Sequence, residues 1–432
     1  MIKLKYLIVI FILTSACSTN DKSGFWKKSN EITVETKEEL LFKKSKLFDK
    51  EFNKNIRINL SQSFQKYKYS ENISNNYKIQ NYDGILKEKK KYKFKKINDL
   101  NVLSSDILFT KNDNVVFFDK LGSIFLLDQN LNLKWKKNFY SKKEKKIEPL
   151  LNFALVGDNI LVADNLGYIY SINEFNGDLI WKKKNDAAFN SNIKIKHNSF
   201  YVVDFNNVLK SFSTKNGSLN WKYQSENTLI KSKKKFYLVI NKNKIIFINT
   251  VGDINALNVL DGNLIWQTPT QKTTIYQDSF SINYSDLVSD EKSVFFSNTE
   301  NEIFSIDLIT GNVIWKQNIN SSVRPSIIDD LLFTITSNGF FVILDKKNGN
   351  IIRSTNLRNS INNLGKKTQV VGFLIAKKFL YLTLSNGKML KINILNGEVE
   401  KVYNLDNSLI SKPFIYKKKL YIISNNTIKN FD

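Results

Sequence analysis

Few residues in this 432-residue chain belong to the types that do covalent or metal chemistry. The sequence holds one cysteine, Cys17, and one histidine, His197. A single cysteine excludes an intrachain disulfide and a cysteine-cluster zinc site, and a single histidine excludes a multi-histidine metal centre. A Ser-His-Asp triad would have to use His197. No nucleophile motif stands beside that residue in IKIKHNSFYVVDF, so we interpret it as a surface turn between two strands.

The residues before Cys17 read as a targeting segment. Two lysines precede an apolar run at 7–13 that is too short to cross a bilayer, and small residues lead into the cysteine. This pattern resembles a bacterial lipoprotein signal, in which cleavage before Cys17 exposes the cysteine for lipid attachment. Thr14 departs from the leucine that such signals prefer, and an ordinary secretory signal with an incidental cysteine is the alternative. Ser18 follows the cysteine, which by the resemblance implies an outer-membrane anchor facing the periplasm.

The chain is strongly basic. It carries 65 Lys+Arg and 40 Asp+Glu, a formal net charge of +25, and its 42% hydrophobic content is enough to build a core rather than a disordered chain. The lysines are spread among Asn, Ile, Phe and Tyr, while arginine is scarce. Nucleic-acid surfaces more often show Arg-rich clusters with aromatic residues, so no nucleic-acid partner is predicted. Two interpretations of the positive charge remain. It results either from a biased codon composition with a solvated surface, or from contact with an anionic partner such as a membrane.

The regular part of the chain is a repeat. A seven-residue strand pattern with apolar third and sixth positions recurs eight times, at steps of 38 to 49 residues. A further strand-like run, rich in Val, Ile, Phe and Tyr, precedes each copy. Such spacing predicts an all-β, eight-bladed propeller of four-stranded blades. The copies are residues 122–128, 167–173, 207–213, 252–258, 301–307, 339–345, 387–393 and 426–432.

Most copies are followed by a turn glycine and, four residues later, by a tryptophan. We call this position the Trp slot, and five of the six tryptophans occupy it. A flat indole at the start of an outer strand is suited to packing between neighbouring blades, so we interpret the slot as structural rather than as a cofactor cage. Its occupants are Phe94, Trp135, Trp181, Trp221, Trp266, Trp315, Arg353 and Lys401.

The eighth copy ends without an outer strand. Residues 91–97 (KYKFKKI) are predicted to supply that strand and to close the ring by pairing with the last blade, which removes an exposed sheet edge. The predicted organisation is a signal peptide over 1–16 and a lipidated cysteine with a polar tether over 17–55. An N-terminal extension over 56–90 and the propeller over 91–432 follow.

The Gly-x-x-x-Trp signal after a strand ending in Asp or Asn resembles the repeat of pyrroloquinoline-quinone-type propellers. Together with the lipoprotein signal and tether, it makes the chain similar to the BamB family. The resemblance implies a non-enzymatic, cofactor-free subunit of the machinery that inserts β-barrel proteins into the outer membrane. It implies docking to BamA and contact with unfolded client proteins. A family stretch that contacts BamA is comparable to Leu229, Ile230 and Lys231, for which an ordinary inter-strand loop is the alternative interpretation.

Two other functions are compatible with a propeller. A quinoprotein dehydrogenase would need a calcium ion held by carboxylate and amide oxygens, and that family typically carries an adjacent cysteine pair, which this chain lacks. A periplasmic propeller lipoprotein that binds an anionic polymer would use the positive charge directly. Salt-sensitive association would favour the polymer, whereas a salt-tolerant apolar contact would favour docking to BamA.

Overall fold

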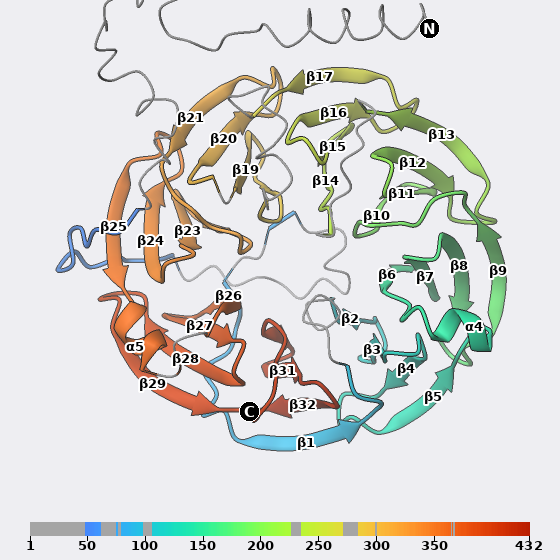
Figure 1. Cartoon of the computed structure of the whole chain (residues 1–432), viewed down its shortest axis with the longest axis horizontal. Coiled ribbons are helices and arrows are strands. Elements are labelled where there is room, and N and C mark those ends of the chain that lie inside the picture. The colour runs from blue at the N-terminus through green and yellow to red at the C-terminus, as the bar shows by residue number, and fades with distance from the viewer. Residues whose placement is uncertain are drawn as a thin grey trace, which may run out of the picture. The chain divides into compact units, whose positions relative to one another are not determined.

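The computed structural model describes residues 48–61, 75–76, 79–97, 106–225, 235–270, 284–298, 300–363, 365 and 368–432. Eight four-stranded antiparallel sheets stand around one ring (Figure 1). The predicted eight-bladed β-propeller is therefore confirmed. Within the described ranges, no helix combines the length and the apolar character needed to cross a membrane.

The strands run outward within each blade in chain order, from the innermost to the outermost. Blade 1 consists of β2 (Leu108–Phe109), β3 (Val115–Phe118), β4 (Ile124–Leu127) and β5 (Leu133–Lys137), and blade 2 of β6 (Leu151–Val156), β7 (Asn159–Asp164), β8 (Tyr168–Asn173) and β9 (Leu179–Lys184). Blade 3 consists of β10 (Lys194–Lys196), β11 (Ser199–Val203), β12 (Val208–Ser213) and β13 (Leu219–Gln224), and blade 4 of β14 (Val239–Asn241), β15 (Lys244–Ile248), β16 (Ile254–Asn258) and β17 (Leu264–Thr268).

Blades 5 to 8 follow the same order, except that the last blade takes its outermost strand from the N-terminal part. Blade 5 consists of β18 (Val288–Ser289), β19 (Ser293–Ser297), β20 (Ile303–Asp307) and β21 (Val313–Gln317), and blade 6 of β22 (Ser326–Ile328), β23 (Leu331–Ile335), β24 (Phe340–Asp345) and β25 (Ile351–Asn356). Blade 7 consists of β26 (Val370–Ala376), β27 (Phe379–Leu384), β28 (Lys388–Asn393) and β29 (Val399–Asn404), and blade 8 of β30 (Phe414–Tyr416), β31 (Lys419–Ile423), β32 (Thr427–Phe431) and β1 (Glu88–Lys93). Two short helices, α4 (Lys142–Lys145) and α5 (Arg358–Asn362), interrupt the described loops.

Burial separates the inner strands from the outer ones. The second strand of blade 7, β27 (FLYLTL), is buried at all six positions, because its two faces pack against the neighbouring blades. The outermost strand of blade 2, β9 (LIWKKK), has no fully buried position. The Val, Ile and Phe content of the runs before each seven-residue copy thus builds the core, and the charged residues of the outer strands form the rim.

The N-terminal strand closes the ring as the sequence predicts. β1 pairs antiparallel with β32 from Glu88, opposite Phe431, to Lys93, opposite Thr427. The strand therefore starts three residues before the predicted 91–97 and ends before Phe94. Its start is earlier because β32 extends to Phe431 and finds its partner at Glu88. Beyond the strand, the Phe94 amide still donates to the carbonyl of Asn426 at 2.9 Å.

The antiparallel order gives the ring two different faces. Turns that join first to second strands, and third to fourth strands, open on one side, which we call the hairpin face. Turns that join second to third strands, such as that between β11 and β12, lie on the opposite side, which we call the crossover face. The His197 turn joins β10 to β11 on the hairpin face, where the exposed residue has a φ of 53°.

Residues 48–61 and 79–86, here named the N-terminal strap, run against the ring before β1. Phe48 packs edge-on against Phe340 at 6.1 Å between ring centroids. Phe52 then pairs with the free edge of β25 through two hydrogen bonds to Ser354, of 3.1 and 2.9 Å. Figure 1 shows this first part of the strap beside β25, at the outer rim of blade 6.

The strap continues over the hairpin face of blades 6 and 7. The Ile58 amide donates to the Leu395 carbonyl at 3.2 Å, and the Ser61 amide donates to the Asp329 carboxylate at 2.9 Å. Gln80 then forms a parallel bridge with Ala376, and the Leu86 amide reaches the carbonyl of Asp432 at 2.7 Å. The strap therefore connects three consecutive blades before its chain becomes the closing strand.

Candidate functional site

In most blades the Trp slot contacts the next blade. The indole Nε1 of Trp135 in blade 1 donates to the Glu174 carbonyl of blade 2 at 2.7 Å. Trp221, Trp266 and Trp315 make the same bond, at 3.2, 3.3 and 2.9 Å, to the carbonyls of Val259, Leu308 and Lys346. Each acceptor is the first residue after the third strand of the following blade. Four of the tryptophans thus make the same hydrogen bond to the next blade.

The turn glycine of the following blade packs against the same indole. A Cβ atom on Gly311 would lie 2.6 Å from the Trp266 ring, and the backbone there has a φ of +78°. Only glycine tolerates both constraints without strain. Trp181 meets the next blade in a related way, stacking on Phe200 at 6.2 Å between ring centroids and lying against Gly217.

Arg353 occupies the slot in blade 6 and is fully buried. Its Nη2 donates to the Ile394 carbonyl at 2.6 Å, which is the position that an indole reaches in the other blades. Its Nη1 donates to the carbonyls of Leu395 at 2.6 Å and of Ile56, in the strap, at 3.1 Å. Burial lowers the pKa of the Arg353 guanidinium to about 10, so it stays charged at neutral pH. The substitution therefore keeps the inter-blade bond and adds an anchor for the strap.

Lys401 and Phe94 occupy the two slots on either side of the ring closure. In blade 8 no hairpin joins the third strand, β32, to the fourth, β1, because these strands come from distant parts of the described chain. A tryptophan at position 401 would have no such turn to contact, and Lys401 is exposed, with its Nζ 4.9 Å from the Tyr403 ring centroid. Phe94 packs on Phe117 and Phe125 of blade 1 at 5.2 and 6.5 Å between centroids.

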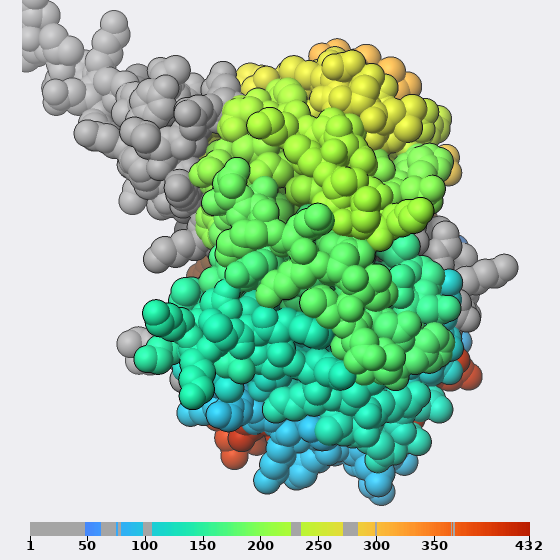
Figure 2. Space-filling model, turned by 90° about the vertical axis from the view of Figure 1, so that its right-hand side faces the viewer, coloured from blue at the N-terminus to red at the C-terminus, as the bar shows by residue number. Residues whose placement is uncertain are grey.

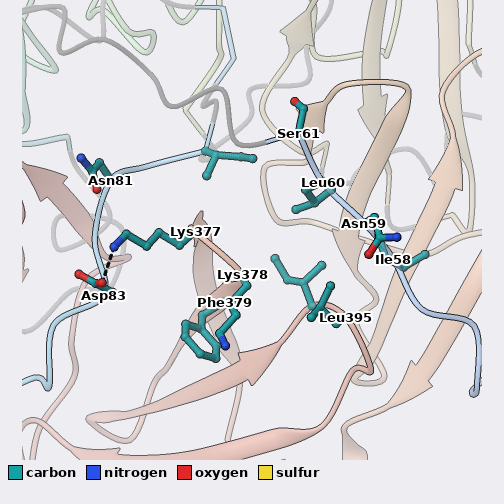
Figure 3. A pocket seen from close by; sticks show the side chains of 12 residues that line it. Ile58, Asn59, Leu60, Ser61, Asn81, Asp83, Lys377, Lys378, Phe379 and Leu395 are labelled. Atoms are coloured by element: carbon teal, nitrogen blue, oxygen red, sulfur yellow. Dashed lines mark hydrogen bonds and ion pairs between the residues drawn. The ribbon is translucent and has the colours of Figure 1, made fainter.

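A cavity of about 770 Å³ lies between the strap and the hairpin face of blade 7 (Figure 3). Ile58, Leu60, Phe379 and Leu395 supply apolar lining. At one side Lys377 extends toward Asp83 of the strap and pairs with it, as the dashed line in Figure 3 marks. The hydrogen bond from Lys377 holds the pKa of Asp83 below its ordinary value. The apolar part of the lining is suited to holding apolar groups.

A group of charges gathers where the innermost strands begin. Asp106, Lys235 and Lys412 stand directly before or close to the first strands of blades 1, 4 and 8. The Lys235 Nζ lies 3.6 Å from the Asp106 carboxylate, and Lys412 pairs with the other carboxylate oxygen. Burial alone would raise the pKa of Asp106, but the charges of Lys412 and Lys235 hold that pKa well below its usual range. Burial lowers the pKa of Lys235.

This charge cluster links blades that lie on different sides of the ring. Sequence reasoning missed it because its members are 129 and 306 residues from Asp106 and share no local pattern. Because both lysines pair with the single carboxylate of Asp106, we interpret the cluster as a contact that stabilises the fold. The part of the chain that the structure describes holds no group of three or more His, Cys, Asp or Glu side chains placed to ligate a metal.

Two of the sites predicted from the sequence lie outside the described residues. These are Cys17 and the candidate partner-binding stretch Leu229, Ile230 and Lys231. The described neighbours of that stretch are Ser225, directly after β13, and Lys235, in the charge cluster. The connection from β13 to β14 joins two blades, so both of these flanking positions belong to the crossover side of the ring.

The blade number, the slot contacts and the turn glycines define a propeller of the pyrroloquinoline-quinone-like repeat class. A family model described as outer membrane protein assembly factor BamB matches residues 122–355, which is more than half of the chain. The chain belongs to that family.

Individual relatives are more distant. The outer membrane protein assembly factor BamB of Legionella pneumophila (strain Paris) is 30% identical over 132 residues, which cover 29% of this chain and 33% of that protein. The match therefore spans about a third of the relative's length.

Solved structures show the same fold. The crystal structure of BamB from Moraxella catarrhalis superposes with a TM-score of 0.66 at 12% identity, covering 81% of this chain and all of that one. Quinohemoprotein alcohol dehydrogenase from Comamonas testosteroni superposes with a TM-score of 0.62 at 8% identity, covering 82% and 78%. At these identities the superpositions establish the architecture and not the activity.

Replacing Arg353 by methionine should lower the free energy of unfolding by about 2–4 kcal/mol, because the change leaves three carbonyl acceptors without their charged donor. The same replacement at Lys401, in the equivalent slot of blade 7, should change it by less than about 0.5 kcal/mol. Urea unfolding of both variants measures the difference. Equal losses at the two slots would refute the structural role given to Arg353.

Stability should fall in acid as Asp106 takes up a proton. A carboxylate whose pKa is depressed in the folded chain stabilises it above pH about 4, and that contribution is lost as the pH falls through the lowered pKa. Asp106→Asn should therefore lower the free energy of unfolding by about 2 kcal/mol at pH 7. Below about pH 4 the free energy of unfolding of this variant should depend less on pH than that of the unchanged chain. The control Asp178→Asn breaks an exposed pair with Lys137 and should cost under about 0.5 kcal/mol. Chemical unfolding between pH 2 and 7 measures both, and an unchanged acid slope in Asp106→Asn would rule out this assignment.

Proposed function

We propose that this chain is a non-enzymatic scaffold subunit of the machinery that assembles β-barrel proteins in the outer membrane. The observation that carries the proposal is the BamB family match over residues 122–355, which runs from β4 to β25. The ring supports it, because buried inner strands and repeated inter-blade bonds form a rigid body that can present loops to partners. The dehydrogenase alternative rests on likeness of fold alone.

The proposed partners are a BamA-like barrel subunit and unfolded outer-membrane protein clients. Leu229, Ile230 and Lys231 are the proposed docking residues for the barrel subunit, on the connection between blades 3 and 4. Two apolar residues beside one lysine are suited to an interface whose apolar centre is bordered by charge. No cofactor is part of this function.

The proposed location is the periplasmic side of the outer membrane. Cys17 is the proposed site of lipid attachment, and removal of residues 1–16 would leave it at the N-terminus. Between Cys17 and the first described strap residue, Phe48, lie thirty residues. A stretch of that length can span up to about 100 Å when extended, enough to let the ring reach a partner beside its anchor.

Affinity purification of the tagged chain from detergent-solubilised membranes should recover the barrel subunit at both moderate and high salt. The tag follows a flexible linker after Asp432, because that residue bonds to the strap. The triple variant of Leu229, Ile230 and Lys231 to alanine should reduce recovery by at least about tenfold, as expected for loss of an interface centre.

The matched control changes Ser232, Lys233 and Lys234 of the same loop to alanine and should keep the partner. Failure to recover the barrel subunit at either salt would contradict the proposed function. Recovery that is lost equally in both variants would instead contradict the assignment of the docking residues.

A further inference from the structure

The rim of the ring is unevenly charged. Strand β1 carries four lysines and one glutamate in six residues, and β5 and β9 carry three lysines each with no acid. These are the outermost strands of blades 8, 1 and 2, which are neighbours in the ring. The other five outermost strands, β13, β17, β21, β25 and β29, together hold four cations and one glutamate, and one of those cations is the buried Arg353. Composition alone would spread lysine evenly over equivalent strands.

Helix α4 adds to the same sector. It carries Lys142, Lys143 and Lys145, with Lys146 at its C-cap, and Figure 1 shows it beside the outer strands of blade 2. Its one acid, Glu144, is occupied by the capping box with Ser141 and by a 2.7 Å hydrogen bond from the Tyr168 hydroxyl. These bonds, that from the Ser141 backbone foremost, lower the pKa of Glu144 to about 2. We call β1, β5, β9 and α4 together the basic rim.

The strands of the basic rim are the outermost strands of three neighbouring blades. Figure 2 faces this side of the ring, with the light-blue segment that holds β1 below and the teal and green segments of blades 1 to 3 above it. Some of its lysines are paired, as Lys89 is with Asp432 at 2.7 Å. Others, including Lys90, Lys134 and Lys183, have exposed side chains.

Large apolar side chains stand among these lysines. Leu133, Leu179, Ile180 and Phe175 are exposed by 45, 44, 49 and 63%, where β5 and β9 begin and in the turn before β9. Lysines beside exposed leucine, isoleucine and phenylalanine are the composition of surfaces that lie on a bilayer, because ammonium groups meet phosphates while apolar groups enter the boundary region.

We propose that the basic rim docks on the surface of an anionic phospholipid bilayer, with its lysines facing the headgroup phosphates. The rim is convex and lysine-rich, whereas nucleic-acid sites gather arginines and stacking aromatic residues along a groove. Each lysine near an anionic surface adds attraction, so ten lysines on three adjacent strands act together. This inference goes beyond the proposed scaffold function and does not depend on it.

Vesicle flotation tests the proposal. The chain is used without the predicted signal peptide 1–16 and with Cys17→Ser in every sample, so that neither the apolar leader nor a lipid attached to the cysteine can cause binding. Vesicles of phosphatidylglycerol and phosphatidylcholine are compared with vesicles of phosphatidylcholine alone. The rim variant K90Q/K134Q/K143Q/K183Q is compared with the control K292Q/K316Q/K378Q/K401Q, which removes the same charge from exposed lysines elsewhere on the ring.

The chain should bind the anionic vesicles and not the neutral ones, and 0.5 M salt should abolish binding. The rim variant should bind at least about tenfold more weakly, while the control should change by less than about threefold. Thermal unfolding verifies that both variants are folded. Equal weakening of the two variants would overturn the proposal, and so would absence of binding to the anionic vesicles. Tighter binding to a DNA duplex than to the vesicles at the same salt would also overturn it.

Discussion

Blades 1, 3, 4, 5 and 6 are each held to the next blade by a side-chain donor that reaches a hairpin carbonyl after the third strand. The indoles of Trp135, Trp221, Trp266 and Trp315 make this bond, and a glycine in the receiving turn lets the ring approach. This bond joins outer strands whose other positions are largely exposed to solvent. A ring held at its rim as well as its core can keep its loops in fixed positions.

Arg353 and Lys401 occupy the Trp slot at two special places, where the ring meets the strap and where it adjoins the blade closed by β1. Arg353 preserves the bond to the next blade and also binds the Ile56 carbonyl, so the strap is attached where it passes from the rim to the hairpin face. Lys401 precedes the one blade closed by a strand from the N-terminal part, where no equivalent turn exists. The absence of tryptophan therefore has a different structural setting in each of the two blades, although both departures look alike in the sequence.

Much of the fold was predictable because its signals are local and repeated. The eight copies, the turn glycines and the closing strand follow from patterns within a few residues, although the bounds of β1 and of several other strands differ from those predicted. The strap, the cavity beside Phe379 and the cluster around Asp106 were not predictable, since they join residues far apart in the chain with no shared period. The basic rim was visible in principle, as lysines at equivalent outer-strand positions, but its significance required the order of blades around the ring.

The scaffold function and the membrane contact assign separate surfaces to separate partners: the connection between blades 3 and 4 to the barrel subunit, and the rim of blades 8, 1 and 2 to the bilayer. Cryo-electron microscopy of the chain with the barrel-assembly complex in an anionic nanodisc tests this division most directly. Partner density should lie next to Ser225 and Lys235, with β1, β5 and β9 turned toward the lipid. A barrel subunit that covers β1, β5 and β9, or a bilayer facing β17, β21 and β25, would contradict the account.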